Sequence, residues 1–152
     1  RYALTNASIL LLGKSPTTDC TATPADCLSN AFTRTDGLKT VGITNAAEDT
    51  RGLLFVCASS TGITANDCGA ALNKLTGKAP AIIYSTGRNA GVGGIGADET
   101  ANPNSNSVNN DSVFVSHVPS PATSLNGEFD DIVTWLSPNI LYNRMVTAGK
   151  LP

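Results

Sequence analysis

Four cysteines, arranged as two close pairs, constrain the fold of this chain more than any other feature of its sequence. Six residues separate Cys20 from Cys27 and ten separate Cys57 from Cys68, and both intervals are rich in turn-forming residues. We predict local disulfides, 20–27 and 57–68, each of which stabilises the fold by about 2.5 kcal/mol in the loop-entropy model. Crossed pairing closes longer loops and stabilises by about 4 kcal/mol in the same model, so energy alone leaves the pairing open. Free buried thiols are the alternative to any disulfide.

The composition narrows the class of protein. Charged residues make up 14% of the 152 residues, against about 25% in typical domains. A net charge of −2 offers no basic surface to a nucleic acid, which we exclude as a partner. The cysteine spacings do not match those of structural zinc sites, and the chain has one histidine. Disulfides and uncharged polar residues therefore favour an oxidising, extracellular location and a single domain spanning 1–152.

Hydrophobic patterning predicts an α+β fold. Short apolar runs bounded by turn residues predict strands at 2–12, 38–43, 53–57, 81–86, 112–118 and 129–136. Apolar residues at spacings of three and four predict a short helix over 67–75, closed by Gly77. The best-defined element is a C-terminal helix over 138–148. Ser137 is its N-cap and Pro138 its first residue, and Ile140, Leu141, Met145 and Ala148 form its apolar stripe.

Two long loops, 87–111 and 119–127, hold most of the residues that suggest chemistry. Residues 91–96 match the G-x-G-x-x-G pattern of dinucleotide-binding loops, but the following residues do not predict the helix that such a loop requires. His117 is the one histidine, and no Cys or Ser has a recognisable elbow or base beside it. The adjacent Asp130 and Asp131 point to opposite faces of a strand. We therefore predict that the protein is not an enzyme and uses no organic cofactor.

Calcium is the one ligand that the loop residues favour. Hard cations bind carboxylate, amide and carbonyl oxygens, and the long loop and the following strand supply many of these. The candidate donors are Asp98, Glu99, Asn102, Asn104, Asn106, Asn110 and Asp111, with Asp130 or Asp131 closing the site. No EF-hand pattern is present, and a solvated loop without a cation is the alternative.

Four segments resemble, in the same order, the type IV pilins and the type II secretion pseudopilins. They are APAIIYSTGRNAG (79–91), GADETAN (96–102), VFVSHVP (113–119) and GEFDDIVTWLSPNILYNRMVTAGKLP (127–152). The resemblance implies a pilin-like globular head, a twisted antiparallel sheet with short helices. In that family the sheet packs on a long N-terminal helix, which is absent from this chain. An exposed apolar groove is therefore expected on the domain.

The resemblance also bears on the metal site. Major pseudopilins bind calcium before an Asp-x-Asp-Ile strand, and Asp131 with Ile132 fits the second half of that pattern. Phe129 stands where the first Asp is expected, so Asp131 is the one matched ligand. Asp98 is added from the loop residues alone. The two predicted Ca²⁺ ligands are thus Asp98 and Asp131.

The function that the resemblance implies is structural. We expect a pilin or minor pilin of an extracellular, cell-surface type IV pilus-like filament, held in the inner membrane through the absent helix before assembly. Its partners are then copies of itself, other pilins or a separate short helical pilin chain, and the two loops are displayed for adhesion or lateral contact. The alternatives are a pseudopilin of a type II secretion system and a free-standing extracellular Ca²⁺-dependent binding module.

Overall fold

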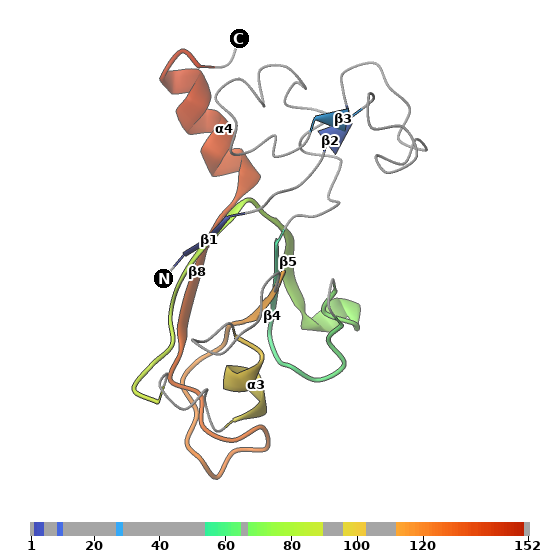
Figure 1. The fold of residues 1–152 in the computed structure, drawn as a ribbon, viewed down its shortest axis with the longest axis vertical. Coiled ribbons are helices and arrows are strands. Elements are labelled where there is room, and N and C mark those ends of the chain that lie inside the picture. The colour runs from blue at the N-terminus through green and yellow to red at the C-terminus, as the bar shows by residue number, and fades with distance from the viewer. Residues whose placement is uncertain are drawn as a thin grey trace.

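The computed structural model describes residues 2–4, 9–10, 27–28, 54–64, 67–89, 96–102 and 112–150, and it has an α+β fold (Figure 1). The predicted strand at 38–43, Cys20 and the Gly-rich 91–95 lie outside these residues. The elements described are β1 (Tyr2–Leu4), β2 (Ile9–Leu10), β3 (Cys27–Leu28), β4 (Leu54–Cys57), η2 (Ala71–Asn73), β5 (Lys74–Ala79), β6 (Ala81–Ser85), α3 (Ala97–Thr100), β7 (Val113–Val115), β8 (Ile132–Leu136) and α4 (Pro138–Thr147).

Two three-stranded sheets face each other across the core (Figure 1). The first has the order β1-β6-β8 and is antiparallel throughout. The second has the order β5-β4-β7, in which β4 pairs antiparallel with β5 and parallel with β7. A separate antiparallel pair joins β2 to β3. The expectation of an antiparallel sheet is therefore wrong for the second sheet, because β7 returns to β4 in the same direction.

The core forms between the inner faces of the two sheets. Ile82 and Val133 of the first sheet pack with Val56 and Phe114 of the second, and all four are at least nine-tenths buried. Tyr84 meets Phe114 edge to face, with ring centroids 5.4 Å apart, a geometry that aromatic pairs prefer. Alternation of inward and outward residues along β6 and β8 leaves the other face of the first sheet for solvent.

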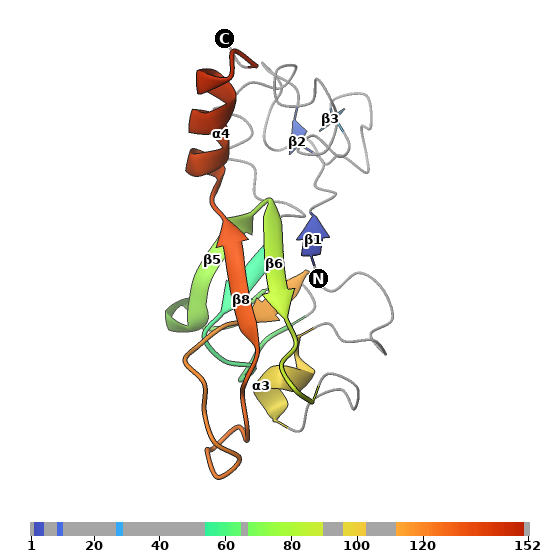
Figure 2. The same cartoon turned by 90° about the vertical axis from the view of Figure 1, so that its left-hand side faces the viewer.

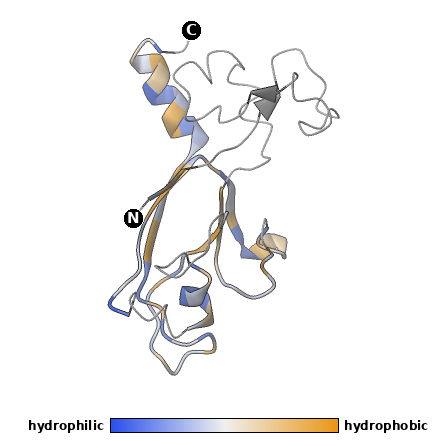
Figure 3. Ribbon diagram, viewed as in Figure 1, coloured by the Kyte–Doolittle hydropathy of each residue, from blue (hydrophilic) through white to orange (hydrophobic). Residues whose placement is uncertain are grey.

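That outer face, defined by its eight positions on β1, β6 and β8, is turned toward the viewer in Figure 2. Four large apolar side chains stand on it, and their exposed fractions are 74% for Tyr2, 55% for Leu4, 66% for Ile83 and 66% for Ile132. The remaining positions are Ala81, Ser85, Thr134 and Leu136. The outer face therefore carries no charged residue. In Figure 3 the strands of this sheet carry hydrophobic stretches, whereas α3 is hydrophilic.

The C-terminal helix was predicted well because its signals are local. Ser137 Oγ accepts a hydrogen bond from the Ile140 N–H at 3.3 Å, and Pro138 begins the helix. The helix ends at Thr147, one residue before the predicted end. The predicted apolar stripe is wrong in part, since Ile140 is exposed and Tyr142 is the buried residue.

Another local prediction is wrong. The predicted helix over 67–75 is a single 3₁₀ turn, η2, and Leu75 and Gly77 belong to strand β5. Gly77 lies against the Phe55 ring on β4, where a Cβ atom would collide. Of the predicted strand 2–12, the structure describes β1, which pairs with β6, and β2, which pairs with β3. In the 67–75 segment, pairing with β4 overrides the local helical pattern.

Candidate metal site beside a buried carboxylate

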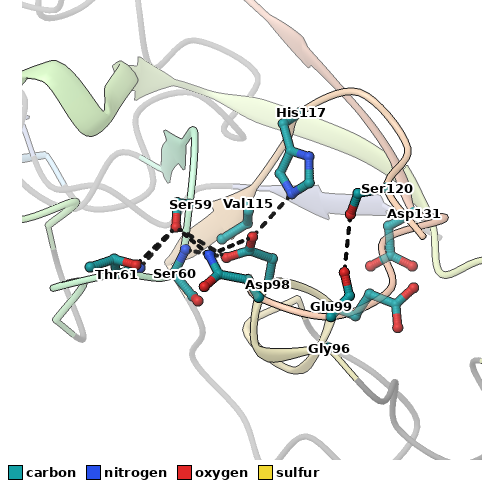
Figure 4. A network of polar contacts seen from close by, with 12 residues as sticks. Ser59, Ser60, Thr61, Gly96, Asp98, Glu99, Val115, His117, Ser120 and Asp131 are labelled. Atoms are coloured by element: carbon teal, nitrogen blue, oxygen red, sulfur yellow. Dashed lines mark hydrogen bonds and ion pairs between the residues drawn. The ribbon is translucent and has the colours of Figure 1, made fainter. Parts of the chain in front are cut away.

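Helix α3 is one turn long and carries two consecutive buried acids, Asp98 and Glu99. Residues adjacent in a helix leave it about 100° apart, so the two carboxylates enter different surroundings. Figure 4 shows Asp98 directed toward Ser59, Ser60 and His117, and Glu99 directed toward Asp131. A helix this short is not stable alone, so these side-chain contacts determine where it lies.

Asp98 accepts hydrogen bonds from four groups. Its Oδ1 lies 2.6 Å from the Ser60 backbone N and 3.3 Å from Ser59 Oγ, and its Oδ2 lies 3.0 Å from Asn126 Nδ2 and 3.1 Å from His117 Nε2. Burial favours the neutral acid, but the donors from Ser60 and Asn126 and the charge of His117 outweigh it, so the pKa of Asp98 falls below its ordinary value of 3.8. Asp98 is therefore a fully engaged carboxylate.

His117 belongs to the same network. Its Nδ1 lies 2.7 Å from the Val118 carbonyl oxygen, and its ring stacks on Phe129 with centroids 3.9 Å apart. Asp98 thus stands between Ser59 and His117, whereas a serine nucleophile needs the histidine between hydroxyl and carboxylate. This order of contacts does not fit the nucleophilic triad.

A second acidic group lies on the other side of α3. Glu99, Asp130 and Asp131 each place one carboxylate oxygen within 4.8 Å of the others. Glu99 accepts hydrogen bonds from Asn89 Nδ2 at 2.8 Å and from the Asp130 N–H at 2.9 Å, and Asp131 accepts one from Asn102 Nδ2 at 2.8 Å. Burial raises the pKa of Asp131 above its ordinary value, and the charges of Glu99 and Asp130 raise it further.

This acidic group fits a hard divalent cation. All three donors are carboxylate oxygens, the ligand type that Ca²⁺ and Mg²⁺ prefer. Asp130 Oδ1 is buried without a hydrogen-bond partner, whereas its Oδ2 accepts from the Arg88 N–H at 3.0 Å. Gly87, with a φ of +47°, lies against the same carboxylate, and a Cβ atom there would collide with it. A bound cation would supply a positive countercharge to the three carboxylates.

The structure separates the two predicted calcium ligands. Asp131 belongs to the acidic group, whereas Asp98 does not, because its carboxylate binds Ser59, Ser60, Asn126 and His117 instead. The acid of α3 that lies beside Asp130 and Asp131 is Glu99, which was one of the wider set of candidate loop donors. Asn102 is a structural residue, since it is 1% exposed and its side chain bonds both the N–H and the carbonyl of Val115. The predicted donors Asn104, Asn106, Asn110 and Asp111 lie outside the described residues.

Two further sequence features can be compared with the structure. Cys57 and Cys68 form a disulfide, in agreement with local pairing, and Cys20 lies outside the described residues. A helix does open after Gly96, contrary to the expectation for the Gly-rich motif. Because its first turn contains two buried acids, it disfavours the phosphates that a dinucleotide loop binds.

Within the described part of the chain, no helix has the length and apolarity needed to cross a membrane. Comparison of the sequence with family models and curated proteins, and of the fold with solved structures, finds no match.

Proposed function

We propose that this domain is a non-catalytic structural subunit of an extracellular filament of the type IV pilin class. The observation that carries the proposal is the outer face of the β1-β6-β8 sheet, which exposes Tyr2, Leu4, Ile83 and Ile132 and has no charged position. Contiguous apolar surfaces of this kind are typical of protein contacts. The sequence resemblance to pilins supplies the class of filament.

The dimensions of the outer face favour a helix as its partner. Three strands spaced by about 4.8 Å span about 10 Å, which matches the roughly 10 Å diameter of an α-helix. Burying side chains such as Ile83 and Ile132 contributes about 1.5–3 kcal/mol each. In the proposed filament, this partner is the N-terminal pilin helix, either joined to the head or supplied by a separate chain.

Substitutions on the outer face test the proposal in the organism that encodes the protein. Ile83→Lys or Ile132→Lys leaves a folded domain, because each side chain is 66% exposed, but prevents filament assembly. The matched control is Ile140→Lys on α4, where the side chain is 54% exposed and away from the outer face. Electron microscopy and mass spectrometry of sheared surface fractions provide the measurement.

The outcomes separate the candidate functions. Loss of fibres in the two outer-face variants, with fibres retained in the control, supports the proposal. Fibres of normal abundance in all three variants contradict it. A periplasmic chain that never enters surface fibres, but whose outer-face variants block protein secretion, identifies the pseudopilin alternative.

We further propose that the acidic group of Glu99, Asp130 and Asp131 binds Ca²⁺ and stabilises the head. The observations that favour this are the three converging carboxylates, the raised pKa of Asp131 and the unpaired Asp130 Oδ1. Calorimetric titration of chelator-treated protein tests it, with Mg²⁺ titrated in parallel. No heat from either cation contradicts a metal site, and tighter Mg²⁺ binding identifies a different metal.

A further inference from the structure

Asp98 connects α3, which carries Glu99 of the acidic group, to a loop closed by a disulfide. Residues 58–64 follow Cys57 directly, and the Cys57–Cys68 disulfide closes the loop. Asn73 spans its interior, donating from Nδ2 to the carbonyl oxygens of Ser59 at 2.9 Å, Thr61 at 3.3 Å and Cys68 at 2.9 Å. The Ser60 N–H that binds Asp98 is therefore held in a constrained backbone.

Asn126 is a second anchor for α3. The Asn126 carbonyl accepts a hydrogen bond from the Ala97 N–H at 2.8 Å, while its side chain donates to Asp98 and to Ser59 Oγ at 2.9 Å. Asn126 thus binds both the backbone and the carboxylate of α3. With both anchors in place, the next residue, Glu99, meets Asp130 and Asp131.

From this geometry we infer that Asp98 is the positioning residue of the cation site. Its carboxylate fastens α3 to the disulfide-closed loop and to Asn126, and thereby sets the position of Glu99 opposite Asp130 and Asp131. The inference rests on the proposed Ca²⁺ binding. It adds that cation affinity depends on Asp98 and its hydrogen-bond partners, which donate no oxygen to the cation.

The expected effect is on cation affinity. Partners in the second layer around a metal typically change its affinity by about 10- to 100-fold when they are removed. A shift of α3 would move the Glu99 carboxylate relative to Asp130 and Asp131. It would also disturb the hydrogen bonds that its two oxygens accept from Asn89 and from the Asp130 N–H. We expect Asp98→Asn to weaken Ca²⁺ binding by about 10-fold or more.

Removing the Asp98 charge also weakens cation binding directly, so a second variant isolates positioning. Asn126→Ala leaves the net charge unchanged and removes the donors to Asp98 and Ser59. We expect a several-fold loss of affinity in this variant. The control is Asp67→Asn, which makes the same chemical change as Asp98→Asn in a surface ion pair with Lys74, 2.9 Å away. Its affinity should equal that of the wild type.

The experiment measures the Ca²⁺ dissociation constant by calorimetry, on the disulfide-bonded protein and well below the melting temperature of each variant. Circular dichroism verifies that each is folded, so a purely structural role for Asp98 would lower the melting temperature without changing the affinity. Weaker binding by both Asp98→Asn and Asn126→Ala supports the inference. If Asp98→Asn does not fold, Asn126→Ala decides.

Other outcomes overturn the inference in distinguishable ways. Normal affinity in a folded Asn126→Ala variant contradicts positioning, and any loss in Asp98→Asn is then due to its charge. Normal affinity in both variants refutes the inference but leaves the proposed cation site intact. If the wild-type protein binds no Ca²⁺, both the inference about Asp98 and the proposed cation site are contradicted.

Discussion

Asp98 and Asp131 are almost equally buried, at 4% and 5% exposure, yet their pKa values shift in opposite directions. For both, burial is the largest influence, and it favours the neutral acid. Four donors surround Asp98, whereas Asp131 has Asn102 as a donor and two carboxylates, Glu99 and Asp130, as neighbours.

The difference shows that burial alone does not identify a metal ligand. A buried carboxylate with a complete set of protein donors is already stabilised as an anion, and a cation would have to displace those donors. A buried carboxylate among other carboxylates is destabilised as an anion, and a cation relieves that repulsion. Asp98 is thus part of the scaffold, and Asp131 is a ligand of the proposed cation site.

The largest expected effect is on the scaffold side of this comparison. Asp98→Asn should lower the free energy of unfolding by about 3 kcal/mol, because the new amide group faces the donors of Asn126 or His117 instead of accepting from them. Urea denaturation in chelator measures the loss. A decrease below about 1 kcal/mol would show that the network around Asp98 contributes little to stability.

Calcium should produce the next largest effect, on the site side. At a free concentration 100 times the dissociation constant, Ca²⁺ raises the free energy of unfolding by about 2.7 kcal/mol, because it binds the folded state alone. Thermal melting with excess Ca²⁺ and with excess chelator provides the comparison. Asp131→Asn should abolish the difference and Asp67→Asn should retain it. Equal melting temperatures for the wild type in both conditions would contradict a stabilising site.

Asp131→Asn in the absence of metal should have a smaller effect with the opposite sign to Asp98→Asn. The amide oxygen keeps the hydrogen bond from Asn102, and the repulsion by Glu99 and Asp130 is removed. We expect a stability gain of up to about 1 kcal/mol in urea denaturation with chelator. A marked loss of stability would instead indicate that the Asp131 charge is stabilised by the folded protein.

The smallest effect is expected from pH, again in chelator. The raised pKa of Asp131 means that the folded state binds this proton more tightly than the unfolded state does. The free energy of unfolding therefore rises as the pH falls toward that raised pKa, which lies above 3.8. Asp98 has a lowered pKa, so its stabilisation is present above 3.8 and is lost as pH falls below it. The urea midpoints of the wild type and Asp131→Asn should differ at pH 7 and converge as the pH falls through the raised pKa of Asp131. Parallel curves would contradict the raised pKa.

The sequence predicts those parts of the fold that depend on neighbouring residues. Ser137 and Pro138 begin α4 where expected, since an N-cap acts within one turn. The segment 67–75 shows the limit, because Leu75 belongs to a strand paired with β4 rather than to a helix. The parallel pairing of β4 with β7 has no local signal at all.

The candidate site shows the same limit. Asp131 was identified through its position before Ile132 in a motif that resembles the pseudopilins. The sequence does not distinguish Asp98 from Glu99, because two adjacent acids look equivalent there, whereas α3 turns them to different surroundings. The short acidic turn after Gly96 was the available signal, and recognising it as a helix would have separated the two residues.

The parallel pairing of β4 with β7 has a consequence for the order of folding. β4 and β5 are close in sequence and are joined by the disulfide-closed loop. Pairing them therefore costs little loop-closure entropy. β7 is far from β4 in sequence, since β5, β6 and α3 lie between them, and it brings Phe114 into the core. Contacts between distant residues slow folding, so docking of β7 is expected to limit the folding rate of this domain.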